Sequence, residues 1–177
     1  RSSKKKLYKM KLILENWRQY ITEEEEEQKL YSFDFDNTLI RYNTLEDGDI
    51  EYIGPHKENI QLAKDLAAEG NKVIIVTSRK AYAPGSPKMP WDDSPSPEEL
   101  IAQENLPIEE IYYTGGNLKS DKLVELGVYK HWDDDEEEVE AARSAGVEAV
   151  LVPTDWGITE GLRNKWINHL AAEQNQN

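Results

Sequence analysis

Cysteine is absent from the 177 residues of this chain. Its absence excludes a disulfide scaffold, a thiolate metal site and a catalytic cysteine, and it agrees with a reducing compartment. Long apolar runs are missing too: none approaches the roughly 20 residues that a membrane helix needs, and no signal-peptide hydrophobic region is present. We therefore expect a soluble, cytoplasmic protein with no membrane association.

Basic residues are few and unevenly placed. The chain has 21 Lys and Arg against 35 Asp and Glu, a formal net charge of −14, and the first 20 residues hold seven of the basic ones. The remaining, strongly acidic body does not attract polyanions at long range, which argues against tight non-specific nucleic-acid binding. A local basic groove for one phosphorylated end stays compatible with this charge. The candidates for that groove are Arg41, Arg79, Lys80 and Lys88.

Residues 1–29 are predicted to form a basic amphipathic helix followed by an acidic linker. Five apolar residues share one helical face: Met10, Ile13, Leu14, Trp17 and Ile21. The like-charge run 23–27 should stay solvated. The apolar face either packs on the rest of the chain or docks to a protein partner, and the pattern leaves both open.

Residues 30–172 are expected to form one α/β domain, followed by a polar tail at 173–177. Short apolar runs predict strands at 30–33, 73–76, 111–114, 128–132 and 147–152. Spacing near 3.6 residues predicts helices at 56–69, 97–104, 119–126, 136–145 and 159–172. This alternation indicates a parallel sheet with helices on both faces. Residues 41–55 are enough for a flap hairpin, so no large cap domain is expected.

Polar side chains follow four of the predicted strands. Asp34 and Asp36 follow the first, and the others are Thr77, Lys119 and Asp133. Ligands of such sheets bind outside the carboxyl ends of the strands. Two neighbouring carboxylates repel each other unless they share a cation, so a hard divalent metal is expected. A carboxylate beside that metal can attack phosphorus while its neighbour supplies a proton.

These residues resemble, in order, the four motifs of the haloacid dehalogenase superfamily of phosphohydrolases, over roughly residues 30–155. The matching residues are Asp34-Phe35-Asp36-Asn37-Thr38, Thr77, Lys119 and Asp133-Asp134. Three further stretches resemble the phosphatase domain of polynucleotide kinase 3'-phosphatases: 76–79, 132–135 and 138–147. The resemblance implies a three-layer, Rossmann-like fold with a five-stranded parallel sheet.

The resemblance also implies roles. Asp34 would be the nucleophile, and Asp36 the general acid and then the base. Thr77 would hydrogen-bond a phosphoryl oxygen, and Lys119 would neutralise charge. Lys122 competes for the lysine role, but Lys119 sits nearer the strand-to-helix turn. Mg²⁺ would be held by Asp34, Asp133 and the backbone carbonyl of Asp36. Substrate-binding or supporting contacts would come from Asn37, Thr38, Ser78, Arg79 and Asp134.

The resulting functional hypothesis is a Mg²⁺-dependent phosphomonoester hydrolase that acts on nucleic-acid 3'-phosphate ends or nucleotides. Two alternatives stay open. One is the same chemistry on an unrelated small phosphomonoester, and the other is a noncatalytic assembly protein docked through its N-terminal helix. The proline-rich loop 80–96 carries Tyr82, Met89 and Trp91, which either stack on a base or sugar or pack on the domain.

Overall fold

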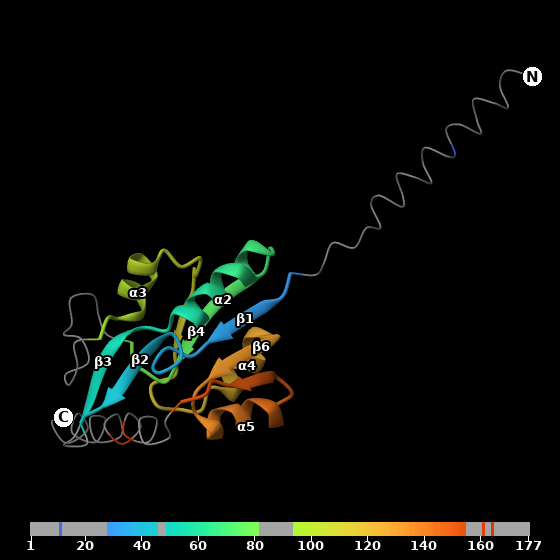
Figure 1. The fold of residues 1–177 in the computed structure, drawn as a ribbon. Coiled ribbons are helices and arrows are strands. Elements are labelled where there is room, and N and C mark those ends of the chain that lie inside the picture. The colour runs from blue at the N-terminus through green and yellow to red at the C-terminus, as the bar shows by residue number, and fades with distance from the viewer. Residues whose placement is uncertain are drawn as a thin grey trace, which may run out of the picture.

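The computed structural model describes residues 11, 28–45, 49–81, 94–154, 161 and 164. Five parallel strands form the central sheet in the order β5-β4-β1-β6-β7 (Figure 1). Their bounds are Leu30–Phe33 for β1, Lys72–Thr77 for β4, Ile111–Tyr113 for β5, Lys130–Asp133 for β6 and Glu148–Leu151 for β7. All five predicted strands are present, and the predicted fold class is confirmed.

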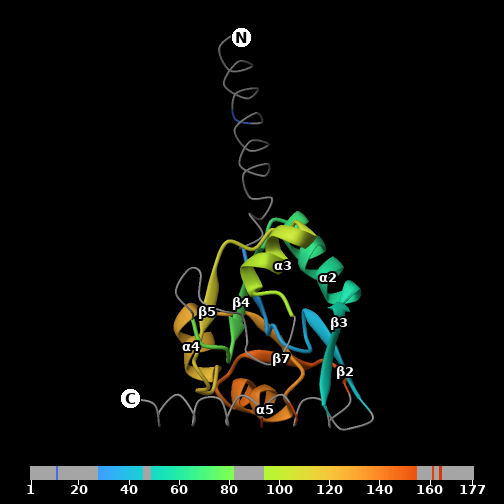
Figure 2. The ribbon, with the colours of Figure 1, turned by 90° about the vertical axis from the view of Figure 1, so that its left-hand side faces the viewer.

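In the described part of the chain, helices cover both faces of the sheet (Figure 2). On one face, α2 (Lys57–Ala68) and α3 (Pro97–Glu104) bury Ile60 and Leu100 against Phe33 and Ile75. On the other face, α4 (Ser120–Leu126) and α5 (Glu136–Ser144) pack on the alternate side chains of the same strands. Strands covered on both sides need apolar residues on both sides, which explains the unbroken apolar run of β4.

A two-stranded antiparallel hairpin follows β1 and lies beyond the carboxyl end of that strand (Figure 1). It consists of β2 (Ile40–Thr44) and β3 (Ile50–Pro55), with a register shift between Arg41 and Tyr42. In the described part of the chain, this hairpin and α2 connect β1 to β4 without a cap domain. The expected flap is therefore present.

The predicted strand 128–132 starts two residues later than expected, at Lys130, because its first residues close α4 instead. Gly127 ends that helix in the left-handed conformation, with φ 70°. The N–H of Val128 then donates to the carbonyl of Leu123 at 3.0 Å, which caps the last turn. Strand pairing is thereby delayed until Lys130.

Two predicted helices fall largely outside the described residues. Of the N-terminal helix only Lys11 is described, and of helix 159–172 only Gly161 and Asn164. Both helices stay predictions, as does the division of the chain at residues 29 and 172. Among the described residues, no helix has the length and apolar character needed to cross a membrane.

Candidate active site

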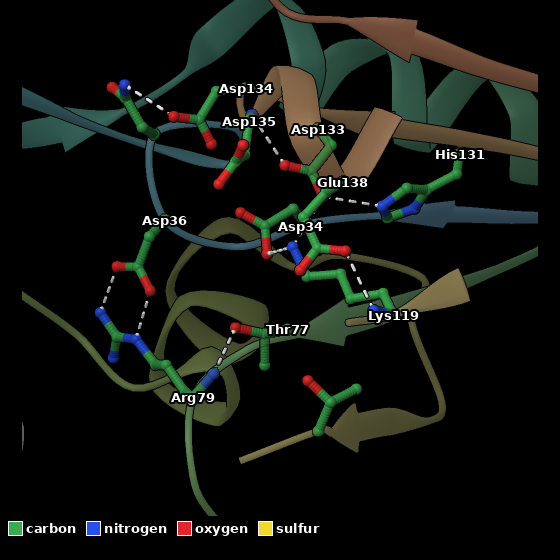
Figure 3. A network of polar contacts seen from close by, with 12 residues as sticks. Asp34, Asp36, Thr77, Arg79, Lys119, His131, Asp133, Asp134, Asp135 and Glu138 are labelled. Atoms are coloured by element: carbon green, nitrogen blue, oxygen red, sulfur yellow. Dashed lines mark hydrogen bonds and ion pairs between the residues drawn. The ribbon is translucent and has the colours of Figure 1, made fainter. Parts of the chain in front are cut away.

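The polar residues expected at the strand ends gather at one edge of the sheet (Figure 3). Asp34 follows β1, Thr77 ends β4 and Asp133 ends β6, and β4 and β6 are the two neighbours of β1. The N–H of Asp34 donates to the carbonyl of Trp132 at 2.8 Å, which ties the loop after β1 to β6. Parallel pairing of three strands thus brings together residues that lie up to about a hundred positions apart in the sequence.

Three buried carboxylates form a cluster at this edge. Asp34, Asp133 and Asp134 are each at most 6% exposed, and each offers one oxygen such that the three atoms lie within 4.8 Å of one another. Carboxylate oxygens at this spacing are the ligands that hard divalent cations prefer. The cluster contains two of the three predicted metal residues and adds Asp134, which had been assigned a supporting role.

Lys119 is the cation at the centre of this cluster. Its Nζ lies 2.8 Å from Oδ1 of Asp34 and 2.6 Å from Oδ2 of Asp133, and its side chain is 3% exposed. Burial opposes the charge, but Asp133 and Asp34 outweigh it and raise the pKa of Lys119 well above its ordinary value. Lys122 instead pairs with Glu125 on the partly exposed outer side of α4. The geometry therefore places Lys119, not Lys122, at the carboxylates.

The negative charge of the cluster exceeds what Lys119 neutralises. Burial raises the pKa of Asp34, and the charges of Asp133, Asp134 and Asp36 raise it further against the opposing effect of Lys119. By contrast, Lys119 and the hydrogen bond from His131 overcome burial and lower the pKa of Asp133. A divalent cation would relieve the repulsion that disfavours ionised Asp34, so the residues present fit a Mg²⁺ ion.

The turn after β5 delivers Lys119 to the carboxylates. The backbone of this turn is joined to the end of β4 and the loop after it by three hydrogen bonds. One of them runs from the N–H of Gly116 to the carbonyl of Ser78 at 2.8 Å. Gly115 and Gly116 adopt φ values of 62° and 88°, which glycine accepts without strain. On the far side, Oε2 of the buried Glu138 accepts the backbone N–H of Lys119 at 3.0 Å.

Asp36 points away from the cluster and pairs with Arg79 (Figure 3). The guanidinium makes two contacts with this carboxylate, Nε to Oδ2 at 2.7 Å and Nη2 to Oδ1 at 2.6 Å. The hydroxyl of Tyr42 in the flap also donates to Asp36, at 2.7 Å. Burial raises the pKa of Asp36, but Arg79 outweighs it and the net pKa is lowered.

Arg79 is held from several sides and is only 5% exposed. It donates to the carbonyl of Pro95 at 3.3 Å and to the hydroxyl of Ser94 at 3.0 Å, and it lies 4.6 Å from the ring centre of Phe35. This residue therefore supports Asp36 and is not a solvent-facing groove cation. Of the other groove candidates, Arg41 and Lys80 are exposed, and Lys88 lies outside the described residues.

The remaining predicted residues line the loop after β1 and the end of β4. Asn37 has φ 56°, and its amide donates to Oδ2 of Asp134 at 3.1 Å and to the hydroxyl of Thr154. The hydroxyl of Thr38 is fully buried and has no hydrogen-bond partner among the described residues. Thr77 accepts the backbone N–H of Arg79 at 3.2 Å, a contact that uses a lone pair and leaves the hydroxyl hydrogen for another acceptor.

Sequence reasoning missed several residues that complete this network. His131 hydrogen-bonds Asp133, Glu138 holds the backbone of Lys119, and Tyr42 contacts Asp36. A signal existed for His131, because residues two apart on a strand share a face and His131 precedes Asp133 by two. Glu138 is one of three consecutive acids in the first turn of α5, and nothing in that run marks it as the buried one.

No protein-family model matches the chain, and no curated protein matches it. Among solved structures, a cobalt-bound deoxy-D-mannose-octulosonate 8-phosphate phosphatase from Haemophilus influenzae is 18% identical, with a TM-score of 0.40 over 68% of this chain and 66% of that chain. A haloacid dehalogenase family enzyme from Bacteroides thetaiotaomicron, an aspartate-to-alanine variant with magnesium and inorganic phosphate, is 10% identical, with a TM-score of 0.44 over 73% and 97%. A putative 3-deoxy-D-manno-octulosonate 8-phosphate phosphatase from Vibrio cholerae is 16% identical, with a TM-score of 0.40 over 81% and 85%.

Proposed function

We propose that this protein is a Mg²⁺-dependent phosphomonoester hydrolase of the haloacid dehalogenase type that works through an aspartyl-phosphate on Asp34. The observation that carries the proposal is the contact of Asp34 with Lys119, 2.8 Å apart within a cluster of three buried carboxylates at the end of the central strand. A structural ion pair alone does not need two further acids around one lysine. A nucleophile that must meet a dianionic phosphate does need such a surplus of cation-binding groups.

The first half of the reaction assigns one task to each group. An oxygen of Asp34 attacks phosphorus, and the bond from phosphorus to the leaving oxygen breaks. Asp36 gives that oxygen a proton, and Thr77 donates its hydroxyl hydrogen to an equatorial phosphoryl oxygen. Lys119 offsets the charge of Asp34 and of the transferring group, which spreads over the equatorial oxygens. In the second half, water attacks phosphorus and Asp36 takes its proton. The bond from phosphorus to the oxygen of Asp34 breaks, which restores the carboxylate and frees inorganic phosphate.

Mg²⁺ would be held by the carboxylates of Asp34, Asp133 and Asp134 and by the backbone carbonyl of Asp36. When bound, Mg²⁺ supplies positive charge beside the phosphate and orients it for in-line attack. The cation also favours ionised Asp34, whose pKa the neighbouring acids raise. The nucleophile is then in the form that can attack.

The Arg79 pair sets a condition on the acid role of Asp36. Because Arg79 lowers the pKa of Asp36, the carboxylate of the resting site is ionised and suited to act as a base. To act first as an acid, it must gain a proton as substrate binds. The negative charge of a phosphate bound beside Asp36 would raise the pKa of this carboxyl by like-charge repulsion and so favour this protonation.

The proposed substrate is a nucleic-acid 3'-phosphate end or a nucleotide. Support comes from the open architecture, in which the described connection between β1 and β4 offers a two-stranded flap and no cap to close over a small molecule. The burial of Arg79 removes one of the four groove candidates, which favours recognition of a single phosphate over a long polyanion. Recognition of a single phosphate is also compatible with the alternative substrate, an unrelated small phosphomonoester.

The mechanism is tested with a generic aryl phosphate under titrated Mg²⁺. Hydrolysis should require the metal, and Asp34→Asn should abolish it while the circular dichroism spectrum stays that of the wild type. Full turnover in excess chelator, or in the Asp34→Asn variant, would contradict the proposal. The substrate is then tested with one oligonucleotide carrying its phosphate at the 3' end, at the 5' end, or at neither, beside a panel of small phosphomonoesters. A preference for the panel would select the alternative.

A further inference from the structure

A buried polar pair lies behind the carboxylate cluster, in the middle of the sheet. Ser32 on β1 and His131 on β6 are direct partners in the parallel register, and both are 0% exposed. The hydroxyl of Ser32 lies 2.8 Å from Nδ1 of His131. Nε2 of the same ring lies 2.9 Å from Oδ2 of Asp133. Both ring nitrogens therefore have partners, as a histidine buried among strands requires.

The direction of the second hydrogen bond follows from the chemistry of its acceptor. An ionised carboxylate has lone pairs and no hydrogen, so Nε2 of His131 must carry the hydrogen and donate it to Asp133. The hydroxyl of Ser32 can donate or accept a hydrogen bond. It can therefore pair with Nδ1 of His131 whether or not that nitrogen carries a hydrogen. Ser32 therefore fixes the ring, and the ring fixes the carboxylate.

Asp133 is consequently held by three donors. Its Oδ2 accepts from Lys119 at 2.6 Å and from His131 at 2.9 Å, and its Oδ1 accepts the backbone N–H of Asp135 at 2.9 Å. Each carboxylate oxygen has room for about two such contacts. Among the described residues, Oδ2 is filled and Oδ1 keeps one acceptor site.

We propose that His131, braced by Ser32, is a positioning residue that turns Asp133 so that Oδ1 presents its remaining lone pair to the metal. This inference rests on the metal site of the proposed function and adds two residues to it. Hydrogen bonds that orient a metal ligand reduce the freedom that the ligand loses when the ion binds. Without the imidazole, Oδ2 of Asp133 would lose one of its two donors, and the orientation of the carboxylate would be less restricted.

The test measures Mg²⁺ binding directly, without substrate, from the rise of the thermal midpoint with metal concentration. His131→Phe keeps a ring of similar shape but has no donor, and we expect it to raise the half-effective Mg²⁺ concentration by about 10- to 100-fold. His131→Gln is the matched control, because its side-chain amide can place an N–H near the position of Nε2. We expect this variant to recover most of the affinity.

A merely structural role for His131 would lower the midpoint of the metal-free protein and leave the half-effective Mg²⁺ concentration unchanged, and that result would overturn the inference. If His131→Phe does not fold, Ser32→Ala decides, because it retains the ring but removes its brace. Weaker Mg²⁺ binding in Ser32→Ala, together with near wild-type Mg²⁺ binding in His131→Gln, would support the inference. Mg²⁺ binding of wild-type strength in Ser32→Ala would refute it. A wild-type protein that Mg²⁺ does not stabilise would refute the metal site itself, which is a distinguishable result.

Discussion

At the scale of single residues, the site depends on one ammonium group shared by two carboxylates. Lys119 contacts Asp34 and Asp133 with almost no exposure to water. Because charges removed from water are costly, each member of such a group is stabilised mainly by the others. Loss of the lysine would leave three acids in repulsion, whereas loss of an exposed lysine changes little.

Lys119→Ala should therefore lower turnover by orders of magnitude and the free energy of unfolding by about 3–5 kcal/mol. Lys122→Ala is the matched control from the same helical segment, and its exposed contact with Glu125 contributes at most about 1 kcal/mol. Steady-state kinetics and denaturant melts of both variants measure the difference. Severe loss in Lys122→Ala with a mild effect in Lys119→Ala would reverse the assignment.

Individual residues also mark what the sequence could predict. Asp34, Thr77, Lys119 and Asp133 were predictable as neighbours because each follows a strand, and strand ends meet at one edge. The partner of Asp36 was not predictable, because Arg79 reaches it from 43 positions away through a loop that has no periodic pattern. Its guanidinium was expected to face substrate, and long-range pairing turned it inward.

At the scale of elements, the N-terminus of α3 fixes the outer wall of the Arg79 site. Ser96 accepts the N–H of Glu99 at 3.2 Å, and the side chain of Glu99 accepts the N–H of Ser96 at 2.8 Å. This capping box holds the chain directly after Ser94 and Pro95, which both accept hydrogen bonds from Arg79. The pair of Arg79 with Asp36 is thus supported by a helix that contributes none of the proposed catalytic groups.

Ser96→Ala should lower the free energy of unfolding by about 1 kcal/mol, because an N-cap acceptor is lost. Ser96→Thr keeps the acceptor and should stay close to the wild type. The effect on turnover should be smaller than tenfold, since the Arg79 contacts with Asp36 remain. Thermal melts and kinetics of the two variants check this, and equal stability of both would show that the capping box contributes nothing here.

The elements themselves were largely predictable. The five strands and the helices at 57–68, 97–104, 120–126 and 136–144 follow from apolar runs and 3.6-residue spacing, with caps that the sequence displays, such as Ser96-Pro97. The start of β6 was not, because the apolar character of Val128 suits both a strand and the closure of α4. In the structure, the hydrogen bond from Val128 to Leu123 closes α4, and the pairing of β6 with β1 starts at Lys130.

At the scale of the whole molecule, charge separates the first 20 residues, which hold seven Lys and Arg against one acid, from the strongly acidic rest of the chain. Just before β1, the side-chain amide of Gln28 donates to the carbonyl of Gly70 at 2.8 Å, and the N–H of Lys29 donates to Oδ1 of Asn71 at 3.3 Å. Every proposed catalytic residue follows Leu30. The N-terminal segment is therefore proposed to be a tethered helix that serves association with a partner.

Deletion of residues 1–27 should leave turnover and the thermal midpoint unchanged. If the apolar face of the segment packed on the domain, its removal would cost several kcal/mol, at roughly 1.5 to 3 kcal/mol for each fully buried side chain. A melt of the truncated protein beside the full chain separates these outcomes. A thermal midpoint lowered by many degrees would refute the tethered helix. The truncated protein retains Gln28, so loss of the hydrogen bond from Gln28 to Gly70 does not contribute to any difference in the midpoint.

The alternation of side chains along β6 has a consequence for how this chain can vary. His131 contacts Ser32, while Trp132 stacks on Phe33 with ring centres 4.7 Å apart, so successive residues serve opposite faces. A single inserted or deleted residue in this strand would exchange the faces, which places an indole beside Lys119 and an imidazole in the aromatic stack. Trp132 can be replaced by another large apolar residue far more easily than the strand can change its length. The length of β6 is thus under tighter constraint than the identity of Trp132.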